Sequence, residues 1–162
     1  MSVNVQIKGL GDSTDSLVER AIAIKQEGEG NDDQGYAQAW CVFDRDSFPP
    51  NRFNRAIQLA ESHGLRVAYS NEAFELWYIL HFEYLQSGLL RDEYKAKLSR
   101  HLKKKYEKKI STMYDELRTR QTTAIRNAAR LLVSYPQPNP EQDNPSTTVH
   151  LLVQELNKFR RA

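Results

Sequence analysis

The first half of the chain alternates short extended segments with helical ones, and this order constrains the fold more than any other feature. Three segments have the composition of strands: 3–7, 37–43 and 65–69. The first alternates apolar and polar side chains, whereas the second is a short apolar run typical of a buried strand. Since a helical pattern follows each segment, the sequence predicts an α/β fold built on a parallel sheet with right-handed crossovers.

No strand pattern follows Tyr84, so we expect the rest of the chain to be helical. Helical patterns cover three further segments, 91–109, 111–118 and 120–135. Closely spaced prolines then break the helix, and an apolar helix begins near Val149. We therefore predict four parts: an α/β core at 1–90, a basic helical extension at 91–135, a Pro-rich linker at 136–148 and a C-terminal helix at 149–162.

The length and composition are those of a globular chain of about one domain. Hydrophobic residues make up 40% and charged residues 27% of the 162 residues, which excludes disorder as the main description. No apolar run approaches the ~20 residues that a membrane span needs, and the N-terminus has no signal-peptide pattern. A single cysteine, Cys41, excludes an internal disulfide, so we expect a cytoplasmic protein without a membrane partner.

The net charge of +2 conceals two segments of opposite sign. Residues 1–90 carry 7 Lys and Arg against 13 Asp and Glu, whereas residues 91–130 carry 13 against 5. In the basic segment, the residues that we expect to bind a DNA or RNA backbone are Arg100, Lys103, Lys104, Lys105 and Lys108. A solvated lysine-rich face is an equally good interpretation of the charge alone.

Two aspartates directly follow the apolar segment 37–43. Asp44 and Asp46 are one residue apart in extended chain, so their side chains point the same way and repel each other without a cation. Ligands of parallel sheets bind outside the carboxyl ends of the strands, and Mg²⁺ (or Mn²⁺) often uses only one or two carboxylates. Such an ion polarises phosphodiesters. The structural alternative is an acidic loop that caps the next helix or pairs with Arg45 or Arg52.

A second group of polar residues follows the extended segment 65–69: Ser70, Asn71, Glu72, Glu75 and, further on, His81. Because this group also follows a strand end, we expect it to share a crevice with the aspartates. Glu75 lies in an apolar run, where an acid needs a partner or a cation. Glu72 suits the first turn of a helix, and we interpret His81 as a half-buried structural histidine.

Three sequences together resemble the RloB family: WCVFDRD at 40–46, AYSNEAFELW at 68–77 and LHF at 80–82. The resemblance covers about residues 3–135 and implies a Toprim-like α/β fold, related to the metal-binding domain of topoisomerases and primases. It also implies a Mg²⁺-dependent nuclease or nucleic-acid-processing protein of bacterial anti-phage defence, acting with a partner protein of the same system. Asp44 and Asp46 match the DxD metal pair of that fold, and Asn71 and Glu75 match the second motif of the family.

The start of the chain departs from the pattern of the family. Toprim-like domains begin with a strand and a turn that carries a glutamate, which acts as acid, base or metal ligand. In the family this strand precedes the one that corresponds to 3–7, so we expect both the strand and its glutamate to be missing here. Three explanations stay open: a shortened gene product, a catalytically degenerate module that binds nucleic acid or a partner, or substitution by Glu72 or Glu75.

Overall fold

Helices and short strands alternate along the chain in this computed structural model, which describes residues 4–9, 14–30, 35–45, 48–49 and 51–160. The elements are α1 (Thr14–Glu29), β1 (Trp40–Asp44), α2 (Phe53–Ser62), β2 (Arg66–Asn71), α3 (Glu75–Ile79), α4 (Arg91–Leu102), α5 (Met113–Leu117), η2 (Arg118–Arg120), α6 (Gln121–Val133), β3 (Ser146–Thr147) and α7 (Val149–Asn157). The predicted α/β class is therefore confirmed.

The three strands form one mixed sheet in the order β1-β2-β3. β1 and β2 run parallel as predicted, but β3 pairs antiparallel with β2, so the expectation of a purely parallel sheet is wrong. The expectation that no strand follows Tyr84 is also wrong, because the chain returns to the free edge of β2 after the prolines. There Thr147 Oγ1 and the Thr148 N–H both donate to the carbonyl of Tyr69, at 2.8 and 2.9 Å. These bonds give a backbone acceptor at that edge of the sheet its hydrogen-bond donors.

The strand predicted at 3–7 is not part of the sheet over the residues that are described, 4–9. Ile7 is 90% exposed and Val5 is also exposed, so neither face of this segment is buried. Alternation of apolar and polar side chains specifies a strand only where one face packs on a core. A hydrogen bond of 2.8 Å from the Tyr36 hydroxyl to Gln6 Oε1 holds the segment near the residues that precede β1.

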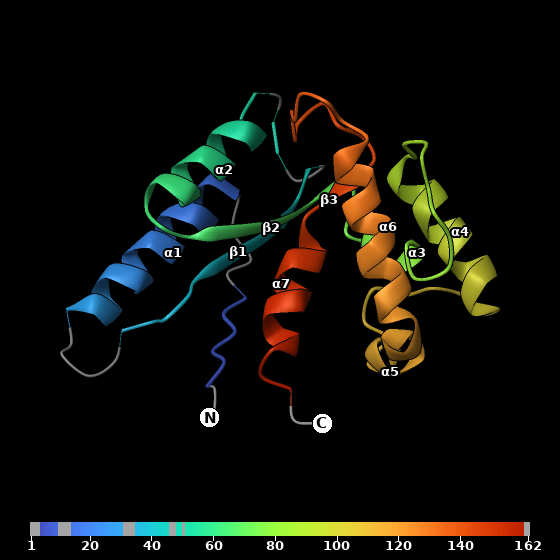
Figure 1. The fold of residues 1–162 in the computed structure, drawn as a ribbon, viewed down its shortest axis with the longest axis horizontal. Helices are drawn as coiled ribbons and strands as arrows, with labels where there is room; N and C mark the ends of the chain where they lie inside the picture. The colour runs from blue at the N-terminus through green and yellow to red at the C-terminus, as the bar shows by residue number, and fades with distance from the viewer. Residues whose placement is uncertain (1–3, 10–13, 31–34, 46–47, 50, 161–162) are drawn as a thin grey trace.

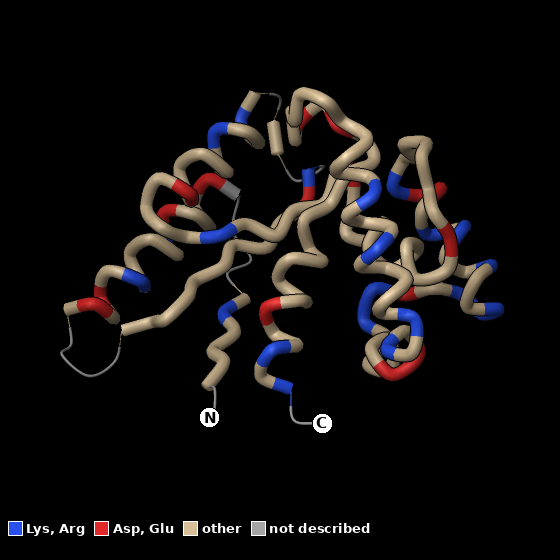
Figure 2. Tube along the Cα trace, in the orientation of Figure 1, with Lys and Arg blue, Asp and Glu red and all other residues tan. Residues whose placement is uncertain are grey.

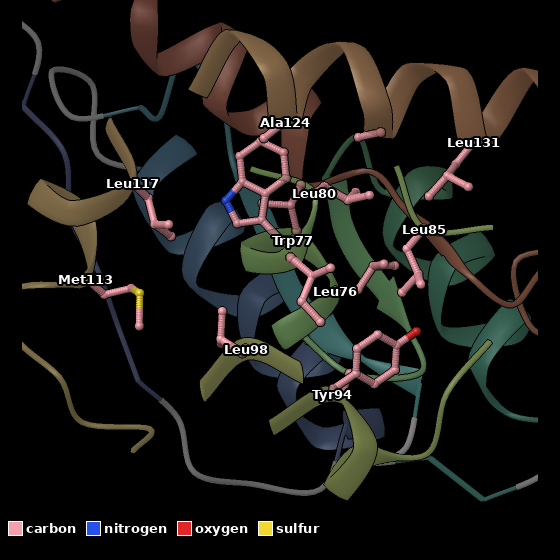
Figure 3. Close-up of a cluster of buried hydrophobic side chains, with 14 of the residues drawn as sticks. Leu76, Trp77, Leu80, Leu85, Tyr94, Leu98, Met113, Leu117, Ala124 and Leu131 are labelled. Atoms are coloured by element: carbon pink, nitrogen blue, oxygen red, sulfur yellow. The ribbon is translucent and has the colours of Figure 1, made fainter. Parts of the chain in front are cut away.

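The sheet separates two hydrophobic cores (Figure 1). α1 and α2 cover one face, into which Phe43, Val67 and Tyr69 point. α3, α6 and α7 lie on the other face, where Ala68 and Trp77 belong to a second core whose side chains Figure 3 shows. Adjacent residues of β2 thus enter different cores, which explains why every residue of the strand after Arg66 is buried. None of the helices described is long and apolar enough to cross a membrane.

α4 ends at Leu102 and not at residue 109, as the helical pattern predicted. Lys103 adopts the left-handed conformation, with φ at 56°, and thereby ends the helix. The Tyr106 N–H then donates to Ser99 Oγ at 2.9 Å, and the Tyr106 side chain enters the second core. The burial of this tyrosine among residues distant in sequence outweighs the local preference for a longer helix.

Candidate functional site

The carboxyl ends of β1 and β2 lie side by side at one end of the sheet. The strand register places Asp44, the last residue of β1, opposite Ser70 of β2. Glu75 begins α3 a short distance after β2. The Asp44 side chain is 16% exposed and Glu75 is 2% exposed, so the second carboxylate is almost fully removed from water.

Two tyrosines connect these carboxylates. The Tyr106 hydroxyl donates a hydrogen bond to Glu75 Oε1 at 3.3 Å, and the rings of Tyr78 and Tyr106 are 6.3 Å apart. Burial, and then the negative charges of Glu75 and Asp44, raise the pKa of the Tyr78 hydroxyl. Burial and the same two carboxylates also raise the pKa of Tyr106, so both phenols stay protonated. Asp44, Glu75, Tyr78 and Tyr106 thus form one group, which we call the carboxylate–tyrosine cluster.

Arg91, the first residue of α4, lies beside this cluster. Its guanidinium nitrogen is 3.6 Å from Asp44 Oδ2, beyond the roughly 2.7–2.9 Å of a charge-assisted hydrogen bond. The arginines named by the acidic-loop alternative have other partners, since Arg45 lies 3.6 Å from Glu141 and Arg52 lies 2.7 Å from Asp15. Arg91 thus brings a positive charge to Asp44 from an element much later in the chain.

Asp44 and Glu75 carry the hard oxygen donors that Mg²⁺ prefers. Over the described part of the chain, no three His, Cys, Asp or Glu side chains converge as a protein cage for a metal. Mg²⁺ does not need such a cage, because water completes its coordination around one or two carboxylates. Buried Glu75 has one hydrogen bond within the described residues, so an anion there needs further compensation. Asp46 lies outside the described residues, and its pairing with Asp44 stays a prediction.

Ser70 and Asn71, two residues that follow the extended segment 65–69, connect β2 to β3 and to the segment that precedes β3. The hydroxyls of Ser70 and Thr147 are 2.9 Å apart. The Asn71 amide donates to the carbonyls of Pro140 and Glu141 at 2.9 and 3.1 Å. Because both side chains are buried and their contacts are internal, they support the strand end that bears the cluster.

Glu72 and His81 have surroundings different from those of the cluster. Glu72 is half-buried, and after burial its charge is a further cause of the raised pKa of Tyr94. His81 is buried, with Nδ1 2.9 Å from the carbonyl oxygen of Trp77. Burial lowers the pKa of His81, so the ring is neutral near pH 7. These contacts agree with the interpretation of His81 as a structural histidine.

The five basic residues predicted to bind nucleic acid are all exposed: Arg100, Lys103, Lys104, Lys105 and Lys108. Lys104 pairs with Glu116, whereas the other four have no ion pair within the described residues. Figure 2 shows that Lys and Arg gather over α4, the loop after it and α6. Since Tyr106 lies in this basic loop, its hydrogen bond to Glu75 anchors the loop to the carboxylate–tyrosine cluster.

The sequence did not predict three residues of this site: Tyr78, Arg91 and Tyr106. Tyr106 falls inside the helical pattern at 91–109, and Arg91 contributes only to the charge of the basic segment. A tyrosine inside a run of lysines was the one available signal, because an aromatic residue there needs a surface to pack on.

The chain was then compared with known proteins. A protein-family model described as RloB-like protein matches residues 2–156. Comparison with curated protein sequences finds no match. Comparison with solved structures finds none either.

Proposed function

The chain belongs to the RloB-like family, and we propose that it is a metal-dependent nuclease with a Toprim-like fold. In this proposal it cleaves nucleic-acid phosphodiesters in bacterial anti-phage defence. The observation that carries the proposal is the position of Asp44 at the end of β1 and of buried Glu75 just after β2, at the carboxyl ends of a parallel strand pair. Carboxylates at that position are suited to hold a divalent cation against a phosphate.

Asp44, Asp46 and Glu75 are the residues that would hold Mg²⁺ or Mn²⁺. The bound ion would supply Lewis-acid stabilisation of the phosphate oxygens and of the leaving oxygen. Tyr106 orients Glu75 through its hydrogen bond, and its raised pKa keeps the proton on the phenol. Arg91, beside Asp44, offers a positive charge to a substrate phosphate, and the exposed lysines attract the polyanion to the site.

The second candidate is a module that binds nucleic acid without turnover. The contact between Arg91 and Asp44 favours it, because a guanidinium at 3.6 Å already offsets the charge of Asp44. This candidate requires the basic loop but no metal. It predicts binding that weakens with salt and does not change on addition of Mg²⁺.

The experiment that separates the candidates combines a cleavage assay with thermal unfolding. The nuclease should cleave DNA or RNA only with Mg²⁺ or Mn²⁺, and Asp44→Asn should lower the rate at least about 100-fold, since removing one charge-stabilising group costs that much. The ion should raise the melting temperature of the wild type but not of Asp44→Asn. The matched control is Asp92→Asn, an exposed aspartate that pairs with Lys95 at 3.2 Å.

Two outcomes would contradict the proposal, the first its site and the second its activity. Cleavage that persists in Asp44→Asn would remove the carboxylate–tyrosine cluster from the reaction. Wild-type protein that binds nucleic acid and shows neither cleavage nor a metal-dependent shift would establish the binding module instead.

A further inference from the structure

A groove of about 770 Å³ lies next to the carboxylate–tyrosine cluster. Residues of α3, α5 and α7 line it, together with residues just after α5 and α7. Tyr78 belongs both to this lining and to the cluster, so a ligand in the groove would lie beside the carboxylates. The volume is in the range of about 300–1,000 Å³ that is usual for small-molecule sites.

Apolar side chains that folding would ordinarily bury are exposed in this groove. Val5, Tyr114, Leu156 and Phe159 all line it, and each is between 43% and 56% exposed. Phe74 and Tyr78 add a further aromatic pair, with ring centroids 5.3 Å apart. A contiguous exposed apolar surface of this kind marks a binding site. Its aromatic composition suits a flat ligand that stacks.

The charges in the lining indicate an anionic ligand. Arg118 and Arg160 are the charged side chains of the lining, and no acidic side chain is among the described residues that form it. A ligand with a flat apolar part and an adjacent negative charge complements this surface. A nucleotide within a strand has both, because each base is attached to a backbone of phosphates.

We propose that the groove binds an unpaired base of a single-stranded nucleic acid, with Tyr114 and Phe74 against the base and Arg118 and Arg160 beside the neighbouring phosphates. This inference rests on the proposed function. It narrows the proposed substrate from nucleic acid in general to single-stranded nucleic acid. In proteins that bind single strands, bases stack on aromatic side chains, and this stacking depends little on the base sequence.

The test compares the binding of two fluorescently labelled probes to the full chain in EDTA, followed by anisotropy. One probe is a short thymidine oligonucleotide, and the other is an abasic strand of the same length and charge. We expect the thymidine probe to bind at least about tenfold tighter, since stacking of one base contributes a factor of about 5 to 150. Tyr114→Ala should remove most of this difference and leave the abasic probe unaffected.

Two further variants distinguish stacking from a general loss of structure. Tyr114→Trp keeps an aromatic ring and should keep the preference for the thymidine probe. Val133→Ala shortens an exposed apolar side chain of α6 that does not line the groove, and should change neither affinity. Melting temperatures of all variants are measured alongside, and the exposed position of Tyr114 predicts small changes.

Four results would overturn the inference: equal affinity for both probes, an equal loss for both in Tyr114→Ala, binding of neither probe, or a dimer that Tyr114→Ala dissociates. The last result would assign the groove to a second copy of the chain. Because the assay measures binding without a metal, its failure is distinct from failure of the nuclease, which the Asp44→Asn cleavage assay measures.

Discussion

The polar residues predicted to be functional in two stretches of the chain, 70–81 and 100–108, have different surroundings. In the first, Ser70, Asn71, Glu75 and His81 are each at most 3% exposed, and each has a hydrogen-bonding partner within the protein. In the second, the lysine and arginine side chains are exposed, and among them only Lys104 has an ion-pair partner within the described residues.

This difference separates polar residues that stabilise the fold from polar residues that act on a ligand. Buried polar groups cost free energy unless they are paired, so their substitution changes stability as well as function. Exposed lysines contribute little to stability, and their substitution changes mainly the attraction of anions. A loss of activity therefore has different meanings in the two stretches.

The largest effect on stability is expected for Asn71→Ala. The truncation leaves the carbonyls of Pro140 and Glu141, two half-buried residues, without this donor and should lower the free energy of unfolding by about 1–3 kcal/mol. Urea denaturation measures this change. Lys105→Ala, from the other stretch, is the control and should stay within about 0.5 kcal/mol of the wild type. Similar free energies of unfolding for the two variants would contradict the proposed difference between the two stretches.

A smaller effect is expected on the pH dependence of stability. Burial lowers the pKa of His81 from its ordinary value of 6.5. As the pH falls below 6.5, the unfolded chain takes up a proton that the folded chain does not, so stability is lost in that range and retained above it. One such histidine contributes a slope of at most about 1.4 kcal/mol per pH unit.

The His81→Asn variant should flatten this slope in denaturation curves recorded on both sides of pH 6.5. Some slope should persist, because burial also lowers the pKa of His150. The double variant His81→Asn/His150→Asn should flatten the slope further. A slope that is the same in all three proteins would show that His81 does not link pH to folding.

The smallest effect is expected for neutralisation in the basic loop. Lys105→Gln combined with Lys108→Gln should weaken the binding of an oligonucleotide a few-fold and leave the melting temperature unchanged. The slope of log affinity against log salt should fall by about 0.7 for each phosphate of a single strand that the variant no longer neutralises. The control is Lys8→Gln with Arg55→Gln, which also removes two exposed charges. Equal effects of both pairs would mean that net charge, and not the loop, attracts the strand.

Local patterns were sufficient for most of the elements. The apolar run before Asp44 and the extended segment before Ser70 predicted β1 and β2, which pair in parallel. Gly64 adopts a φ of 71° just after α2, as expected of a glycine that ends a helix. These predictions hold because periodicity, capping and turn preferences depend on residues close together in the chain.

The sequence-based predictions of secondary structure are wrong where contacts between distant segments decide the local structure. The segment 4–9 has the alternation of a strand but no face to bury, and residues 103–109 have a helical pattern that the burial of Tyr106 interrupts. β3 is two residues long and pairs with β2 only because the chain folds back after the prolines. A short strand of this kind has no pattern of its own.

The sequence by itself determined the α/β class, the family motifs and the position of Asp44 at a strand end, because these depend on neighbouring residues and on the rule for parallel strands. Only the tertiary structure decided which side chains meet there. α4 and the loop after it bring Arg91 and Tyr106 to Asp44 and Glu75, and that approach depends on how α3 and α4 pack in the second core. Packing of this kind is a property of the whole chain, since each contact exists only when residues far apart are folded together.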